Sequence, residues 1–175
     1  MTTTTLAALT TLSLLGACST VGEVPTARIA TASLKSANGL PVGTAQFLAA
    51  GDSVTINVAL AGLGQGTHGM HLHAVGQCTG TDFASAGPHL NPGGHQHGTA
   101  NPAGSHLGDL PNIVLNQLGA GTVVAKLKGN RSEIEQALFD ADGSAIVLHA
   151  DPDDYRTDPS GNSGKRIACG VIQRP

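Results

Sequence analysis

The residues from Gly76 to Asn112 form a long stretch that has neither the two-residue period of a strand nor the longer period of a helix. The stretch is rich in glycine, proline, asparagine and histidine. An irregular segment of this length inside a compact domain is normally functional or disordered. Disorder is disfavoured here, because Cys78 and four histidines offer points at which the segment can be tied down. We therefore expect a functional loop that a separate scaffold supports.

The scaffold is predicted to be all-β. Side chains from Val54 to Leu60 alternate between two faces, which is the period of a half-buried strand. Other strand candidates are residues 27–34, 42–49, 69–74, 121–127, 145–149 and 167–172. The 24 glycines and nine prolines favour many turns, and the scarcity of aromatic residues leaves Val, Ile, Leu and Ala to build the core. These features predict a Greek-key β-sandwich or barrel of about eight antiparallel strands.

One helix and a second irregular segment complete this prediction. Residues 132–139 are the only helix candidate, with Ser132 and Glu135 spaced as a capping box. Residues 150–165 are irregular and follow the strand that ends at His149. Two long functional loops on one β scaffold are where we expect the chemistry.

The N-terminus has the pattern of an export signal. Leu6 to Ala17 is apolar but too short to span a bilayer as a helix, and Leu15 to Cys18 has the form of a lipobox. This pattern predicts a lipoprotein-type signal segment over residues 1–17, a tether over 18–26 and one domain over 27–175. We accordingly expect a periplasmic protein whose lipidated Cys18 anchors it to the membrane. The first basic residue is Arg28, however, so a threonine-rich tail remains the alternative.

Charge and cysteine content narrow the class of protein further. The net charge of −3, without a basic run, argues against binding to nucleic acid. If Cys18 carries lipid, Cys78 and Cys169 remain as a candidate disulfide pair, since disulfides persist in an oxidising compartment. Two unrelated buried thiols are the alternative. The sequence carries no signal for the oligomeric state.

Histidine is the residue type most suggestive of chemistry. All of the eight histidines except His149 lie between His68 and His106. Residues two apart on a strand face the same side, so His71 and His73 present two imidazoles together. Neutral imidazole is a good ligand for copper and zinc. Taken alone, this pair is equally typical of two surface histidines.

Several ordered segments together remove that ambiguity. They are residues 71–73, 85–92, 97–98, 106–109, 145–149 and 161–171. In this order they resemble the copper/zinc superoxide dismutase family, over about residues 27–172. Residues 153–159, Asp-Asp-Tyr-Arg-Thr-Asp-Pro, are similar to the bacterial branch of that family.

The resemblance implies a role for each matching residue. Copper would be bound by His71, His73, His89 and His149, and zinc by His89, His97, His106 and Asp109, so that His89 bridges the two metals. Asp153 would hydrogen-bond ligands of both metals, and His68 would be a packing histidine beside them. The resemblance also implies a Cys78–Cys169 disulfide and places Arg166 where the substrate anion docks. His95 also lies near the expected zinc position, but His97 is followed by glycine as in the family, so we expect His95 to be an exposed loop residue.

The activity implied is dismutation of superoxide to dioxygen and hydrogen peroxide in a two-step copper cycle, with a structural zinc. In that cycle His89 releases copper, takes up a proton and later gives it to the product. A periplasmic metal-binding protein without turnover would use the same ligands, but it would need no anion-docking Arg166. Arg166 on its own could equally be a surface ion-pair residue. A zinc hydrolase ranks third, because it would need an open zinc position and a general base.

Overall fold

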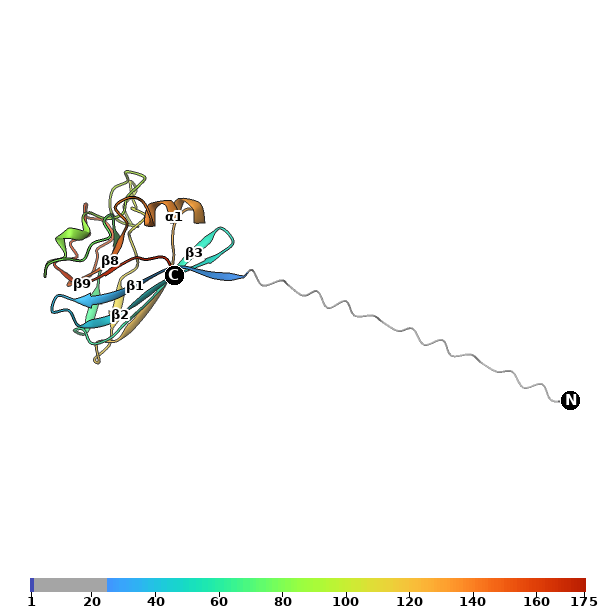
Figure 1. The fold of residues 1–175 in the computed structure, drawn as a ribbon, viewed down its shortest axis with the longest axis horizontal. Helices are drawn as coiled ribbons and strands as arrows, with labels where there is room; N and C mark the ends of the chain where they lie inside the picture. Colours follow the sequence, from blue (N-terminus) through green and yellow to red (C-terminus); the bar gives the residue numbers. More distant parts are fainter. Residues whose placement is uncertain (2–24) are drawn as a thin grey trace.

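The computed structural model describes Met1 and residues 25–175 (Figure 1). The predicted signal segment, the lipidation site Cys18 and nearly all of the tether therefore lie outside the described residues. Within the described part of the chain, no helix has the length and apolar character needed to cross a membrane.

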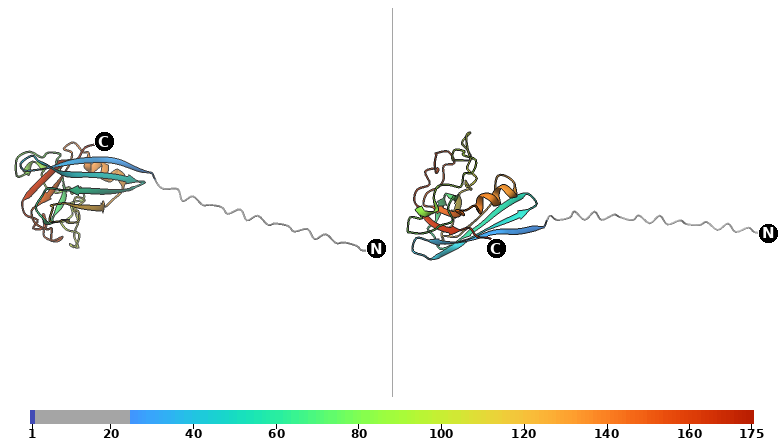
Figure 2. Two further views of the ribbon diagram at one scale, coloured as in Figure 1. Left: turned by 90° about the horizontal axis from the view of Figure 1, so that it is seen from below. Right: turned by 45° about the horizontal axis from the view of Figure 1, so that its top comes forward.

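The scaffold is a curled antiparallel sheet, as the alternating pattern predicted. The strands of this sheet are β1 (Thr26–Ser36), β2 (Pro41–Ala50), β3 (Ser53–Leu60), β5 (Met70–His73), β7 (Gly121–Lys126), β8 (Ala145–His149) and β9 (Arg166–Val171). Their order across the sheet is β5-β8-β9-β1-β2-β3-β7. The strands β1 to β3 form a meander, whereas the chain then crosses to the opposite edge at β5 and later returns to β7 (Figure 2). The predicted Greek-key, all-β class is confirmed.

Two three-residue strands lie apart from the main sheet. β4 (Gly66–His68) pairs with β6 (Ile113–Leu115) in antiparallel register. The sequence reading missed β6 and did not separate β4 from β5, because three residues are too few to show a period. This pair matters for the site, since β6 begins directly after the long irregular stretch ends.

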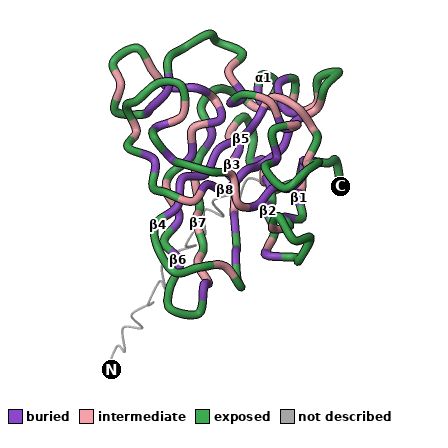
Figure 3. The backbone as a smooth tube through the Cα atoms, turned by 90° about the vertical axis from the view of Figure 1, so that its left-hand side faces the viewer, coloured by how far each residue is buried: buried purple, intermediate pink, exposed green. Residues whose placement is uncertain are grey.

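The core is built mainly from aliphatic side chains, with Phe47 and Met70 among them. Figure 3 shows which parts of the backbone are buried. In β3, Val54, Ile56 and Val58 are buried and alternate with partly exposed neighbours. Fully burying one such side chain stabilises the fold by about 1.5–3 kcal/mol. The single described α-helix, α1 (Arg131–Leu138), adds Ile134 and Leu138 to the same core.

The start of α1 differs from the prediction. The N-cap is Asn130, whose side chain accepts a hydrogen bond from the Glu133 amide while Glu133 Oε2 accepts one from the Asn130 amide. The predicted capping box at Ser132 and Glu135 is therefore wrong by two residues. Asn caps a helix as well as Ser does, and Asn130 carries the extended backbone conformation that an N-cap needs, whereas Ser132 lies inside the first turn.

Both irregular stretches are ordered loops that pack against the edge of the sheet. The first loop (residues 74–112) contains a 3-10 helix, Ala84–Ala86, and passes β5 twice. The Leu90 amide donates to the Leu72 carbonyl, and the Leu72 amide donates to the Gly108 carbonyl, each at 2.8–2.9 Å. The second loop (residues 150–165) connects β8 to β9. The first loop thus delivers its own polar residues beside those of β5.

Candidate metal centre

Strands β5 and β8 place three imidazoles in one buried space. His71 and His73 project from the same face of β5, which pairs with β8 so that His71 lies opposite Val147. His149 is the last residue of β8. All three side chains are almost fully buried. The register of two adjacent strands is therefore what brings residues far apart in the sequence together.

His89 from the first loop completes a group that we call the four-histidine set: His71, His73, His89 and His149. Each of them offers one nitrogen, and these atoms lie within 4.8 Å of one another. Six buried side-chain polar atoms of the described residues have no hydrogen-bond partner, and five of these are imidazole nitrogens. Four of the five belong to this set, namely His71 Nδ1, His73 Nε2, His89 Nε2 and His149 Nε2. A buried polar atom without a partner is costly, so four that converge indicate a ligand for them.

The opposite ring nitrogens explain why these four face inward. His73 Nδ1 donates to the Gly87 carbonyl at 2.9 Å, and His149 Nδ1 donates to the Gly164 carbonyl at 3.2 Å. His71 Nε2 donates to Asp153 Oδ2 at 2.9 Å. Each bond places the proton on the outer nitrogen and leaves a lone pair on the inner one, which is how proteins orient metal-binding histidines.

A second group, which we call the aspartate set, consists of His89, His97, His106 and Asp109. Asp109 Oδ1 lies 3.2 Å from His89 Nδ1, 2.9 Å from His97 Nδ1 and 3.2 Å from His106 Nδ1. His106 Nδ1 is also 3.3 Å from His89 Nδ1. A tetrahedron whose corners lie about 2.0–2.1 Å from its centre has edges of about 3.3 Å. Four of the six separations among the donor atoms are thus close to the edge length of a tetrahedral zinc site.

His89 belongs to both groups. Its Nδ1 faces Asp109 and His106, while its Nε2 is buried without a partner in the four-histidine set. One imidazole ring thus separates the two groups.

The pKa shifts of the histidines differ between the two groups. Burial lowers the pKa of His73 to about 2, of His149 to about 3 and of His89 to about 4, and it also lowers that of His71. These rings are neutral at neutral pH, which is the form that binds metals. Burial acts in the same direction on His97, but hydrogen bonds to Asp109 and Asp153 outweigh it and raise its pKa to about 9.

The two buried carboxylates stay ionised. Burial alone would raise the pKa of Asp109, yet hydrogen bonds from His89, His97 and the Gly98 amide lower it well below its usual range. For Asp153, bonds from His71, His97 and the Tyr155 amide likewise outweigh burial and lower the pKa. The site therefore holds negative charge beside the aspartate set and almost none beside His73 and His149.

Asp153 and His68 contact ligand candidates without joining either group. Asp153 Oδ2 accepts from His71 and Oδ1 accepts from His97 at 3.0 Å, so one carboxylate connects the two groups. His68 is buried, and its Nδ1 donates to the main-chain carbonyl of His149 at 2.9 Å. The structure thus gives His68 a main-chain contact with a four-histidine-set residue and a place outside that set.

Arg166 lies at a surface cleft beside the four-histidine set. Its Nη1 and Nη2 donate to the carbonyls of Phe83 and Gly87, both at 2.7 Å. The Gly87 carbonyl also accepts from His73, so the guanidinium and a set member share one acceptor. The cleft is lined by Thr81, Asp82, Ala84, Gly164, Lys165 and Arg166. Both main-chain contacts hold the arginine in place without neutralising its charge.

The predicted disulfide is confirmed. Cys78 and Cys169 are bonded, with their Cα atoms 5.7 Å apart. Cys78 lies in the first loop and Cys169 in β9. The bond therefore ties the segment that carries Phe83 and Gly87 to the strand that carries Arg166.

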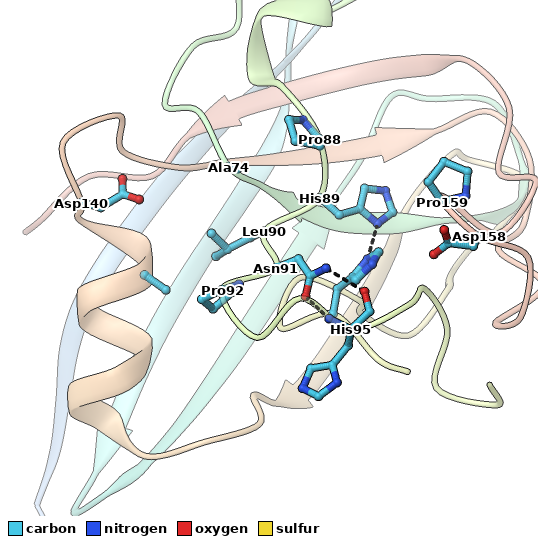
Figure 4. A pocket seen from close by; sticks show the side chains of 12 residues that line it. Ala74, Pro88, His89, Leu90, Asn91, Pro92, His95, Asp140, Asp158 and Pro159 are labelled. Atoms are coloured by element: carbon cyan, nitrogen blue, oxygen red, sulfur yellow. Dashed lines mark hydrogen bonds between the residues drawn. The ribbon is translucent and has the colours of Figure 1, made fainter. Parts of the chain in front are cut away.

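His95, which was predicted to be an exposed loop residue, lies outside both groups. His95 is exposed, and its ring points away from His89 across a groove beside α1 (Figure 4). Asn91 holds its main chain through two bonds, Asn91 Nδ2 to the His95 carbonyl and the His95 amide to Asn91 Oδ1. The His-Gly pattern distinguished His97 from His95, because Gly98 next to His97 donates its amide to Asp109.

Comparison with known proteins agrees with this geometry. Residues 42–172 match the family described as copper/zinc superoxide dismutase (SODC). The chain belongs to the copper/zinc superoxide dismutase family. It is 42% identical over 150 residues to "Superoxide dismutase [Cu-Zn]" of Caulobacter vibrioides, covering 82% of this chain and 85% of that protein.

Solved structures of the family have the same fold. The crystal structure of a SOD-like protein from Bacillus subtilis is 34% identical, with a TM-score of 0.74, and covers 83% of this chain and 99% of that one. The Cu/Zn superoxide dismutase from Brucella abortus is 26% identical, with a TM-score of 0.64, and covers 85% and 100%. The predicted family and its two metals, copper and zinc, are thereby confirmed.

Sequence reasoning missed two residues that touch this centre. Asn112 bonds the main chain of Asp153, and Tyr155 bonds both Asn112 and Asp153. Neither belongs to a metal-binding residue type. The signals for Tyr155 were its place in the 153–159 motif and its being the single tyrosine of the chain.

Proposed function

We propose that this protein dismutates superoxide to dioxygen and hydrogen peroxide. The observation that carries the proposal is the convergence of four partnerless, buried imidazole nitrogens next to a tetrahedral group of three imidazoles and a carboxylate. The four-histidine set suits copper, which accepts imidazole ligands, and the aspartate set suits a closed zinc site. Bound copper would supply a one-electron couple that oxidises one superoxide and, with two protons, reduces a second.

His89 is assigned as the residue that holds a proton for the reaction. Its Nδ1 is committed to the aspartate set, so Nε2 is its one nitrogen that can exchange a proton on the side of the four-histidine set. A proton held there lies next to the place where the reduced oxygen species forms. The contacts of Nδ1 with Asp109 and His106 hold the ring in position during this exchange, and zinc bound by the aspartate set would add to that hold.

Arg166 is assigned to dock the substrate anion. The guanidinium is fixed by two carbonyls rather than by a carboxylate, so its positive charge remains available to superoxide. Burial lowers the pKa of Arg166, but an arginine side chain stays protonated in proteins. The overall charge of −3 does not prevent docking, since steering depends on the field near the cleft. This arginine favours turnover over simple metal storage.

We also propose that the protein works outside the cytoplasm. The apolar segment and lipobox at the N-terminus support export to the periplasm and anchoring through a lipidated Cys18. The Cys78–Cys169 disulfide supports the same location, because disulfides persist in oxidising compartments.

Superoxide dismutation by the full chain, with copper and zinc measured on the same sample, tests the function. We expect activity that requires copper and decreases as salt concentration rises. Arg166→Ala should keep both metals and lose most of the activity and its salt dependence. Full occupancy by copper and zinc without turnover would instead identify a metal-binding protein.

A further inference from the structure

The carboxylate of Asp153 is shared between the two groups. Oδ2 accepts from His71 of the four-histidine set at 2.9 Å, and Oδ1 accepts from His97 of the aspartate set at 3.0 Å. The side chain is completely buried. A rotation of this carboxylate would therefore disturb one ring of each group.

The main chain of Asp153 is clamped by Asn112. Asn112 Nδ2 donates to the Asp153 carbonyl, and the Asp153 amide donates to Asn112 Oδ1, both at 2.9 Å. These bonds fix the position of the Asp153 backbone. They leave the orientation of its carboxylate to other contacts.

Tyr155 supplies the missing contact. Its amide donates to Asp153 Oδ1 at 2.7 Å, and among the described residues no other main-chain group donates to this carboxylate. The Tyr155 backbone is left-handed, with φ of 62°. A left-handed tyrosine is held in an unfavourable conformation, so other contacts must keep it there.

Two such contacts come from the first loop and from the approach to β6. The Tyr155 carbonyl accepts from the Ala100 amide at 3.0 Å, and its hydroxyl accepts from the Asn112 amide at 2.8 Å. A side chain at Gly98 would clash with the Tyr155 carbonyl, so the residue after His97 must be glycine for this packing. Tyr155 thus connects the second loop to both flanks of the aspartate set.

We propose that Tyr155 is a positioning residue that holds the Asp153 carboxylate in the orientation in which it bonds His97 of the aspartate set. The proposal rests on the proposed function, because it takes that set to be the zinc site. The Tyr155 amide bonds the oxygen that faces His97, and the hydroxyl helps to hold Tyr155 in place through the Asn112 amide. Loss of the hydroxyl should therefore affect zinc more than copper. His71, the one ring of the four-histidine set that Asp153 contacts, is also held by the pairing of β5 with β8.

The test compares Tyr155→Phe with wild type and with Thr157→Val. Phenylalanine removes only the hydroxyl. Thr157→Val removes a hydrogen bond to Asp154 in the same exposed loop without touching Asp153. Zinc and copper affinities are measured by competition with chromophoric chelators, and the melting temperature is measured on the metal-free proteins. We expect Tyr155→Phe to weaken zinc binding about tenfold and copper binding by less than about twofold, with Thr157→Val unchanged.

Tyrosine emission gives a second, independent measurement. The chain has one tyrosine and no tryptophan, so the emission of wild type and Thr157→Val reports on residue 155 alone. Zinc added to the metal-free protein should change this emission with the same midpoint as zinc binding. Tyrosine emission that does not change when zinc binds would overturn the proposal.

Three affinity results also overturn it. Unchanged zinc affinity in Tyr155→Phe, with wild type binding both metals, removes Tyr155 from the site and leaves the proposed function intact. Zinc and copper affinities that fall together with the metal-free melting temperature reveal a general structural role. A wild-type protein that takes up no zinc overturns this proposal, whereas the proposed function is decided separately by the copper-dependent dismutation assay.

Discussion

The two halves of the metal centre are built in different ways. In the four-histidine set, three of the residues sit on β5 and β8, whose pairing register fixes their separation. In the aspartate set, every residue comes from the first loop, which has no ladder of its own. The register of paired strands fixes the four-histidine set. The aspartate set is instead held by the hydrogen bonds of Asp109, by two main-chain hydrogen bonds between the first loop and β5, and by contacts with the second loop.

This difference predicts different responses to perturbation. Hydrogen bonds of paired strands persist when a ligand is removed, so the four-histidine half should stay preorganised without metal. The loop half is ordered mainly by contacts among its own metal-binding residues. Zinc affinity should therefore depend on the loop structure, and the loop structure should depend on bound zinc. The predictions below separate the two halves, from the largest effect to the smallest.

Removing a sheet-borne ligand should abolish activity and leave zinc in place. We expect His149→Ala to weaken copper binding by more than about 100-fold. Loss of a residue that only hydrogen-bonds a metal ligand already lowers metal affinity about 10–100-fold, and His149 is itself a ligand candidate. Metal analysis and dismutation assays measure the effect. His95→Ala, an exposed histidine outside both groups, is the matched control. Parallel loss of zinc in His149→Ala would show that the halves are not separable.

Removing the disulfide should loosen the loop half. The Cys78–Cys169 bond closes a sequence separation of 91 residues, which in the chain-entropy model stabilises the fold by about 4–5 kcal/mol. We expect Cys78→Ser with Cys169→Ser to lose about this free energy of unfolding in denaturant titrations and to retain zinc less well than copper. Equal unfolding free energies and equal zinc retention would count against this anchoring role.

Neutralising one carboxylate should empty the loop half selectively. Asp109→Asn keeps the shape of the side chain but removes the charge that contacts three imidazoles. Zinc affinity should fall about 10–100-fold, while copper affinity changes by less than about threefold. Equilibrium dialysis measures both, with Asp52→Asn in an exposed turn as the charge control. A matching loss of copper would mean that Asp109 supports both groups.

The pH dependence of stability in the metal-free protein should report each half separately. The lowered pKa values of His73, His149 and His89 mean that the unfolded chain binds more protons below about pH 6.5. Stability should therefore fall as the pH decreases from about 6.5 toward 3. His97, with its pKa raised to about 9, contributes stability that is lost as the pH rises from about 6.5 through 9.

Melting temperatures measured across this range should therefore peak near about pH 6.5 and fall by a few degrees per unit on the acid side. His149→Ala should flatten the acid limb and leave the alkaline limb unchanged. A flat profile in the wild type would contradict the assignment of neutral imidazoles to the four-histidine set.

The scaffold could be predicted because its signals are local. Alternation in residues 54–60 and the apolar run at 145–149 identify β3 and β8, with boundaries that differ from those observed by at most one residue. The helix predicted at 132–139 is observed at 131–138. Its cap was predicted two residues too late, since both Asn130–Glu133 and Ser132–Glu135 have the required spacing. The strands β4 and β6 depend on mutual pairing and leave no periodic trace.

The candidate site was predictable only in part. Histidines and Asp109 have residue types that indicate metal binding, and ordered motifs assigned them to two groups. The contacts made by Asn112, Tyr155 and the Gly87 carbonyl were not predictable, because they depend on the paths of two loops. Main-chain acceptors in particular carry no sequence signal at all.

The closing strand of the sheet has a consequence for how the molecule is made. β9 is the last strand of the chain, yet it lies between β8 and the first strand, β1. Synthesis therefore completes His71 through His149 before the strand that joins β8 to β1 and carries Cys169. Only after residues 166–171 are present can the strands of the four-histidine set join the β1–β3 meander, and only then can the disulfide that anchors the first loop form.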